Sequence, residues 1–222
     1  MLKSEKLSKI TGHITFVIIF IFFSTLEAKN LDKYNKAENI ADYFSGILLL
    51  NQSKYTDSYQ YFKKLDGLED SHPNYSREYI YSLINSGNFS QAFSFAKKLN
   101  KEKKNNYESD LVLGIKYLKN SKYDLAKTFF IKAKKNNSIS VLNNYILNTL
   151  YIWSDLEGST LEEAKLKLNQ LDNRFDNLKK IQNVFLHCYF NSKDTDLLFN
   201  KLISNEKTDF SRYNYFYARH LD

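Results

Sequence analysis

The stretch Tyr55-Thr-Asp-Ser-Tyr-Gln-Tyr-Phe, at 55–62, has two later counterparts, Phe89-Ser-Gln-Ala-Phe-Ser-Phe-Ala at 89–96 and Tyr123-Asp-Leu-Ala-Lys-Thr-Phe-Phe at 123–130. The interval is the same in both steps, from 55 to 89 and from 89 to 123. An aromatic residue opens each stretch, a small residue follows three places later, and Phe or Ala stands four places after that. A fourth column follows, with Leu65, Leu99 and Ala133. Steps of three and four place these positions on one face of a helix, where the small residue allows a second helix to approach closely.

A second set of columns precedes each stretch. Gly114 follows Gly46 by two of these intervals, and Leu49, Leu83 and Tyr117 recur at every interval. Because a glycine inside a helix costs about 1 kcal/mol relative to alanine, its recurrence predicts a helix contact too close for a methyl group. Between these two glycines, one interval from each, the residue is Ile80 and not glycine. The turn between the two helices of this middle unit has Gly87, where the other units have Ser53 and Ser121.

A helix pair with a 34-residue period resembles the tetratricopeptide repeat family. The resemblance is best over 39–140, in Tyr43-Phe-Ser-Gly-Ile, Gly87-Asn-Phe-Ser-Gln-Ala-Phe and Leu113-Gly-Ile-Lys-Tyr. The family's usual proline after the second helix is missing, since Asp70 and Lys104 stand there and the only proline is Pro73. The resemblance implies an all-α fold, a right-handed superhelical solenoid of antiparallel helix pairs with about four to five repeats.

The period slips after residue 136. Ala164 follows Ala126 by one period plus four places, and the four extra residues predict a longer turn around Gly158. A looser fifth pair spans 178–189 and 197–203. The last segment, 213–221, predicts a first helix without a second. Because terminal repeats normally present a polar outer face, this aromatic segment is expected to dock onto a partner, onto a second copy, or onto further chain in a longer relative.

The composition favours helices over sheets. The 222 residues include only one proline and six glycines, too few for the turns of a many-stranded protein. The hydrophobic content of 43%, with 16% aromatic residues, is sufficient for a continuous core, and the aromatic residues are expected mostly inside it. We predict a polar lead-in at 29–38 and one helical repeat domain at 39–222.

The segment at 1–28 has a different pattern. Lys3, Lys6 and Lys9 precede an uncharged run from Ile14 to Leu26, and Ala28 follows. A basic start, a short apolar segment and a small residue at a cleavage site are typical of a secretory signal peptide. An uncleaved membrane anchor is the alternative. Both place the repeats outside the cytoplasm, in the periplasm or anchored at the membrane and facing it.

No catalytic or metal motif stands out, and we predict neither enzymatic activity nor a cofactor. Cys188 is the only cysteine, in an apolar context that favours an inert buried thiol. The four histidines are scattered, without metal-ligand spacing. The neighbouring acids Glu162 and Glu163 are best explained by a favourable interaction with a helix dipole.

The formal net charge is +7, and three lysine clusters lie at 97–98, 101–104 and 132–135. Cations at the C-terminal ends of second helices complement the helix dipole, which is the simplest explanation. The alternative is a basic ridge that attracts anionic lipid headgroups, acidic protein segments or an envelope polymer. For an exported chain, nucleic acid is not expected as a partner.

The resemblance also implies a binding surface, because the family's concave groove is formed by set positions of the first helices. The corresponding residues here are Tyr43, Ile47, Asn51, Arg77, Tyr81, Asn85, Leu111, Ile115 and Lys119. Relatives that clamp a chaperone's terminal carboxylate have lysine and asparagine at the positions of Tyr43 and Ile47, which argues against that ligand. We expect an extended peptide or a helix. The alternative is that these apolar positions are contacts between successive first helices.

The sequence therefore predicts a noncatalytic protein-interaction scaffold of the bacterial cell envelope. The alternative is an accessory repeat segment in the metabolism or assembly of an envelope glycan or other polymer.

Overall fold

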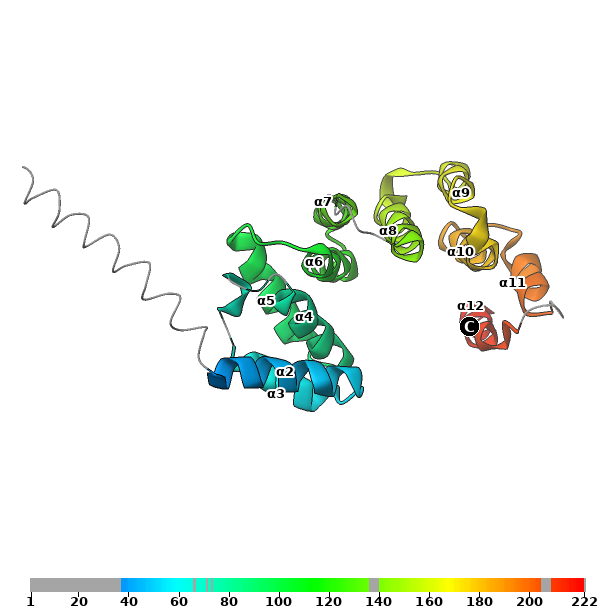
Figure 1. Cartoon of the computed structure of the whole chain (residues 1–222). Helices are drawn as coiled ribbons and strands as arrows, with labels where there is room; N and C mark the ends of the chain where they lie inside the picture. The colour runs from blue at the N-terminus through cyan, green and yellow to red at the C-terminus, as the bar shows by residue number, and fades with distance from the viewer. Residues whose placement is uncertain are drawn as a thin grey trace, which may run out of the picture. The chain divides into compact units, whose positions relative to one another are not determined.

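The computed structural model describes residues 37–65, 67–70, 72, 74–135, 140–204 and 209–221. This part of the chain is all-α, with eleven α-helices packed in adjacent pairs, four short 3-10 turns and no strand (Figure 1). The helices are α2 (Ala37–Asn51), α3 (Tyr55–Lys63), α4 (Tyr75–Asn85), α5 (Phe89–Lys101), α6 (Tyr107–Lys119), α7 (Tyr123–Lys134), α8 (Val141–Ser154), α9 (Leu161–Asn169), α10 (Asp176–Tyr189), α11 (Thr195–Ile203) and α12 (Asn214–Leu221). The four 3-10 turns are η1 (Leu68–Asp70), η2 (Leu156–Gly158), η3 (Asn173–Phe175) and η4 (Ser211–Tyr213).

The predicted signal peptide or anchor and nearly all of the polar lead-in lie outside the described residues. Among the helices that the structure does describe, none combines the length and the apolar character needed to span a bilayer.

The described residues form two compact units, divided after Gln91. In the first unit, α2 packs against α3, α3 against α4, and the two first helices α2 and α4 also touch. In the second unit, successive helices from α6 to α12 pack against one another, and α6 also touches α8. Helices two places apart in the chain thus meet in both units.

Three of the four predicted columns form the core. The residues of these three columns, in every unit, are at most 3% exposed: Ser58, Ala92, Ala126, Phe62, Ala96, Phe130, Leu65, Leu99 and Ala133. The aromatic column is different, because Tyr55, Phe89 and Tyr123 are the first residues of α3, α5 and α7. At a helix start the side chain lies beside the turn, and Phe89 is 65% exposed. Tyr55 and Tyr123 are half-buried, so the expectation that the aromatic residues lie mostly in the core is wrong in this column only for Phe89.

The predicted glycine contact is confirmed in both places. A Cβ atom on Gly46 would lie 2.8 Å from the Phe62 ring, and one on Gly114 would lie closer still to the Phe130 ring. Both distances are shorter than real Cβ contacts, so a methyl group does not fit. On the neighbouring side, the Ser58 hydroxyl donates to the carbonyl oxygen of Gly46 over 2.8 Å. The small residue of the column therefore also ties the two helices together.

The turns after α2, α4 and α6 share one conformation. Ser53, Gly87 and Ser121 have positive φ angles of 59°, 80° and 55°. In each turn, the backbone N–H of the residue that follows donates to a backbone carbonyl oxygen near the end of the first helix. The N···O distances are 2.8–2.9 Å, from Lys54 to Leu49, from Asn88 to Leu83 and from Lys122 to Tyr117. This is the hydrogen bond of a helix C-cap with a left-handed residue. The serines and the glycine are therefore equivalent, although only glycine adopts this conformation without strain.

The slip in the period is confirmed at the next turn. Six residues separate Ser154 of α8 from Leu161 of α9, and they include the turn η2. Helix α9 begins with a capping box, in which the side chain of Thr160 accepts from the N–H of Glu163 and Glu163 bonds back to the N–H of Thr160. Glu163 is thus a helix-capping residue, in line with its predicted structural role.

Candidate functional site

The first unit carries six of the predicted groove residues, three on α2 and three on α4. Tyr43 lies between these helices, where its hydroxyl donates to Glu78 Oε2 over 2.7 Å and its ring lies 4.4 Å from the His72 ring. Burial and the hydrogen bond to Glu78 raise the pKa of Tyr43. Tyr43 therefore ties two successive first helices together and leaves only part of its ring accessible.

Tyr81 is the most accessible aromatic residue of the predicted set. Its side chain is 49% exposed, and one edge contacts the Tyr55 ring at a centroid distance of 6.1 Å. Asn85, one turn later, donates its side-chain amide to the backbone oxygen of Tyr81 over 2.8 Å. Arg77 is exposed, and its guanidinium lies 3.3 Å from Glu78. Ile47 is half-buried and Asn51 is exposed at the end of α2.

The second unit carries the other three predicted residues, all on α6. Ile115 is 44% exposed and Lys119 is exposed at the helix end. Leu111 is half-buried because it packs against the cluster of Ala126 and Phe130. Ile115 therefore occupies, in this unit, the same accessible position that Tyr81 occupies in the first unit.

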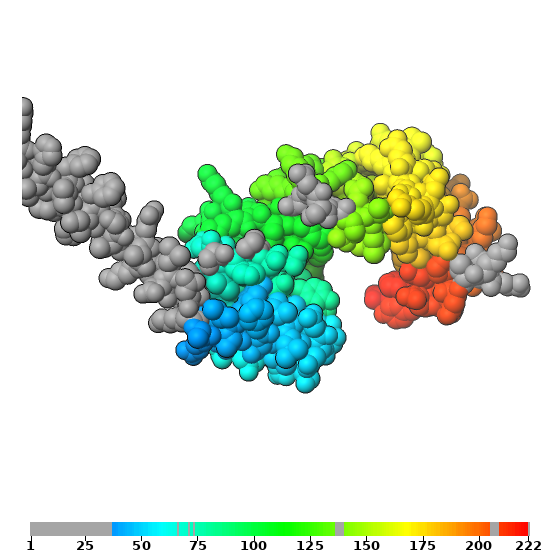
Figure 2. Space-filling model, in the orientation of Figure 1, coloured from blue at the N-terminus to red at the C-terminus, as the bar shows by residue number. Residues whose placement is uncertain are grey.

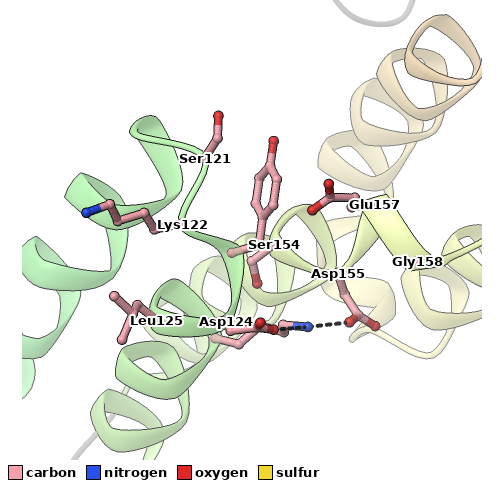
Figure 3. A pocket seen from close by; sticks show the side chains of 10 residues that line it. Ser121, Lys122, Asp124, Leu125, Ser154, Asp155, Glu157 and Gly158 are labelled. Atoms are coloured by element: carbon pink, nitrogen blue, oxygen red, sulfur yellow. Dashed lines mark hydrogen bonds and ion pairs between the residues drawn. The ribbon is translucent and has the colours of Figure 1, made fainter.

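A cavity that the sequence did not reveal lies between two turns of the second unit. It has a volume of about 560 Å³ and is bounded by the turn from α6 to α7 and by the end of α8 with η2 (Figure 3). Lys127 bridges two carboxylates there, at 3.2 Å from Asp124 and 3.1 Å from Asp155. Lys167 also contacts Asp155, at 2.6 Å. These cations hold the pKa of Asp155 below its usual value, first through Lys167.

The charges in this cavity are thus largely used within the protein. In Figure 3, Asp124 and Asp155 lie on either side of the bridging ammonium group, and Glu157 lies apart from them. An acid whose pKa is lowered by ion pairs is a poor general acid or base near neutral pH. The arrangement therefore stabilises the contact between two hairpins rather than providing a reactive group.

Two of the predicted lysine clusters meet at a second cavity, of about 360 Å³. Lys103 from the end of α5 lines it together with Lys132 and Lys135 from the end of α7. A polar network forms one wall, in which Asn105 donates to Asp110 over 2.6 Å. Asp110 is only 3% exposed, and burial raises its pKa. The lysines were visible in the sequence, whereas the buried acid gave no pattern.

Cys188 has partners that the sequence did not predict. Its Sγ lies 3.4 Å from Nδ1 of His220, and Nε2 of the same ring lies 3.3 Å from Asp196. The three residues come from α10, α12 and α11, so they hold the last helix against the preceding pair. The thiol is only half-buried, but burial still raises its pKa. It also lies at the C-terminal end of α10, where the helix dipole opposes a thiolate. His187 turns elsewhere and contacts the hydroxyl of Ser192 at 2.9 Å.

The aromatic C-terminal segment is partly used in packing. The Tyr217 ring stacks on Phe199 at 5.0 Å, and the Phe216 ring meets Phe185 at 5.4 Å. Tyr215 and Leu221 remain 62% and 61% exposed. Within the described residues, no group of three His, Cys, Asp or Glu side chains is placed to hold a metal ion.

Comparison of the chain with protein families, with curated proteins and with solved structures gave no match.

Proposed function

We propose that the chain is a noncatalytic scaffold that binds a peptide or a helix of another protein along its first helices, in the manner of a tetratricopeptide superhelix. The observation that carries this proposal is the recurrence of an accessible apolar side chain at one first-helix position. Ile47, Tyr81 and Ile115 stand one period apart, and each is at least partly exposed. A series of apolar contacts at one position of successive first helices suits an extended peptide or the apolar face of a helix.

Tyr43 adds the rigid part of this surface. Because its hydroxyl is fixed by Glu78, the two helices α2 and α4 are held in register beside the exposed Tyr81. A surface whose backbone is already fixed loses less conformational entropy on binding. We therefore assign Tyr43 a positioning role and Tyr81 and Ile115 the contact with the partner.

Photo-crosslinking tests this assignment. A photoreactive amino acid at position 81 or 115 of the full chain should capture the same protein from envelope extracts. The matched control is position 89, since Phe89 is also aromatic and 65% exposed but begins a second helix. Equal capture from position 89, or capture from position 81 that survives Ile115→Ala undiminished, would exclude this surface.

A second function is favoured by the lysine cavity. Three ammonium groups around one opening suit an anionic ligand, which fits an accessory role in the metabolism or assembly of a charged envelope polymer. Binding of an anionic glycan should then exceed binding of a neutral one and should fall with salt. Lys132→Gln with Lys135→Gln should remove this preference, whereas Lys97→Gln should retain it.

The location outside the cytoplasm is proposed from residues 1–28 alone, and contact with a membrane surface belongs to the same proposal.

Self-association through the exposed Tyr215 and Leu221 is proposed as well. Light scattering tests it, since Tyr215→Ser with Leu221→Ser should lower the mass of any assembly.

A further inference from the structure

The second cavity lies where three segments of the second unit meet. They are the end of α5 with the turn that follows it, the first turns of α6, and the C-terminal end of α7. Figure 2 shows the green atoms of α6 and α7 at the surface of this view. With a volume of about 360 Å³, the cavity has room for a small polar molecule. Its lining residues are Asn100, Lys103, Asn105, Asp110, Lys132 and Lys135.

The positive charge at this cavity exceeds the negative charge that the protein supplies. Three lysines line it, and Asp110 is the only acidic residue among the lining residues. Within the described residues, the side chains of Lys103 and Lys135 form no hydrogen bond or ion pair. Lys132 donates to the amide oxygen of Asn100 over 3.4 Å. The first cavity differs, because its bridging lysines pair with carboxylates, so only the second cavity retains positive charge for an anionic ligand.

A fixed polar network forms part of the lining. The amide nitrogen of Asn105 donates to Asn100 Oδ1 over 3.3 Å and to Asp110 Oδ1 over 2.6 Å. The next residue, Asn106, begins α6 with a capping box, which also fixes the turn. Asp110 is only 3% exposed, so its carboxyl group is the most deeply buried charge of the lining. Because these groups are held in place before a ligand arrives, binding costs little conformational entropy.

The charged groups indicate the chemistry of the ligand. Lysine presents a compact ammonium group without the planar pair of donors of arginine, which suits the tetrahedral oxygens of a phosphate group. An ionised carboxylate only accepts hydrogen bonds, so Asp110 suits a hydroxyl donor and repels a second anion. The hydrogen bond from Asn105 and the charge of Lys132 favour the ionised form of Asp110 against the effect of burial.

We propose that this cavity binds a phosphate ester with a neighbouring hydroxyl group, such as a glycerol phosphate or sugar phosphate unit. The three lysines bind the phosphate oxygens, and Asp110 accepts a hydrogen bond from the hydroxyl group. This assignment rests on the proposed binding of an anionic ligand at the same cavity, and it names the class of that ligand. The unit can belong to a charged polymer, to a lipid headgroup or to a free molecule, because all three present the same groups.

Calorimetry on the full chain at low salt tests the ligand class. Glycerol 3-phosphate should bind at least about fivefold more tightly than n-propyl phosphate, which has the same three-carbon chain without hydroxyl groups. Lys132→Gln with Lys135→Gln should abolish the binding of both esters, because two of the three ammonium groups are lost. The control is Lys97→Gln, which should bind both esters as the unaltered chain does, since Lys97 does not line the cavity.

Asp110→Asn distinguishes a binding role of this residue from a structural one. The change should leave the affinity for propyl phosphate equal or raise it, because a negative charge is removed. It should also reduce the preference for glycerol 3-phosphate to less than about twofold, because a neutral acceptor forms a weaker hydrogen bond. Circular dichroism verifies that the variant is folded. The comparison of the two esters in the unaltered chain needs no variant, so it decides the assignment even where Asp110→Asn does not fold.

Two results would overturn the assignment and leave the anionic site in place. They are equal affinities for the two esters in the unaltered chain, and an equal loss of both affinities in folded Asp110→Asn. If neither the esters nor an anionic glycan bind, the proposed anionic site fails as well. Vesicles identify the source of the unit. Binding to phosphatidylglycerol that requires Lys132 and Lys135 assigns it to a lipid headgroup, and binding no stronger than to phosphatidylcholine assigns it to a polymer or a free molecule.

Discussion

Hairpins α6–α7 and α8–α9 follow one another in the chain but hold their helices together differently. Three residues join α6 to α7, and Gly114 lies directly under the Phe130 ring. Six residues join α8 to α9, and Asn148 stands where the period would place the glycine. There the two helices share an apolar cluster that includes Ile152, Ala164 and Leu168. An ion pair between Asp155 and Lys167 adds to this contact.

The glycine goes with a phenylalanine in the facing column rather than with the length of the turn. Gly46 meets the Phe62 ring and Gly114 meets the Phe130 ring. The helices α4 and α5 are joined by an equally short turn of three residues, but there Ile80 replaces the glycine and Ala96 replaces the phenylalanine. A large residue on one helix is therefore matched by a small residue on the other.

Removal of the ring should have the largest effect. Phe130→Ala should lower the free energy of unfolding by about 3–5 kcal/mol, because it empties a fully buried site that the glycine cannot fill. Leu125→Ala is the control on the same helix, since Leu125 is 45% exposed and its loss should cost less than about 0.5 kcal/mol. Urea denaturation measures both. Equal losses would show that the ring is not central to the short-turn hairpin.

Alanine at the glycine position should distinguish the stability of the two hairpins more directly. Gly114→Ala should cost about 1–3 kcal/mol through overpacking against Phe130, although alanine is the better helix former. Asn148→Ala should change stability by less than about 0.5 kcal/mol, because the Asn148 side chain bonds only with exposed groups, Lys134 and Asn144. A neutral Gly114→Ala would contradict the close contact. Gly114→Ala with Phe130→Leu should recover part of the loss.

The same contrast explains what the sequence could predict. Columns such as Ser58, Ala92 and Ala126 were readable because one packing constraint acts at every period, so the helices, the glycine contact and the slip all followed. Tyr55, Phe89 and Tyr123 recur equally well but start helices, and periodicity alone does not separate a buried face from a helix start.

The polar sites could not be predicted because their members come from different repeats. Asp155 and Lys127 belong to different hairpins, as do Cys188 and His220, and neither pair is separated by one period. Such contacts depend on the geometry between hairpins. The lysines around the second cavity were visible as clusters, but their meeting with the buried Asp110 required the fold.

The turn residue should have a smaller effect of opposite sign. Ser121→Gly should stabilise the chain by about 0.5–1 kcal/mol, because Ser121 has a φ of 55° and glycine relieves the strain of a left-handed residue. The matched change in the longer turn is Gly158→Ala. Gly158 lacks a positive φ and its missing Cβ would meet nothing within 4 Å, so alanine should be neutral or stabilising by up to about 1 kcal/mol. Thermal or urea unfolding distinguishes them; destabilisation by Ser121→Gly would contradict the strained turn.

The smallest effect concerns the polar contact of α8–α9 and depends on pH. Because ion pairs lower the pKa of Asp155 in the folded chain, its contribution to stability is fully present above the unfolded pKa of about 4 and is lost as the pH falls through the lowered value. Asp155→Asn should therefore cost about 0.5–1 kcal/mol at pH 7 and progressively less toward pH 2, as expected for a partly exposed ion pair.

Urea unfolding of both proteins at several pH values measures this difference. Glu157→Gln is the control, because it removes an exposed carboxylate from the same cavity and should give a difference that varies less with pH. A cost of Asp155→Asn that stays constant from pH 7 to pH 2 would mean that Asp155 acts through packing. The longer turn would then hold its helices together without charge, and the contrast with α6–α7 would rest on the glycine alone.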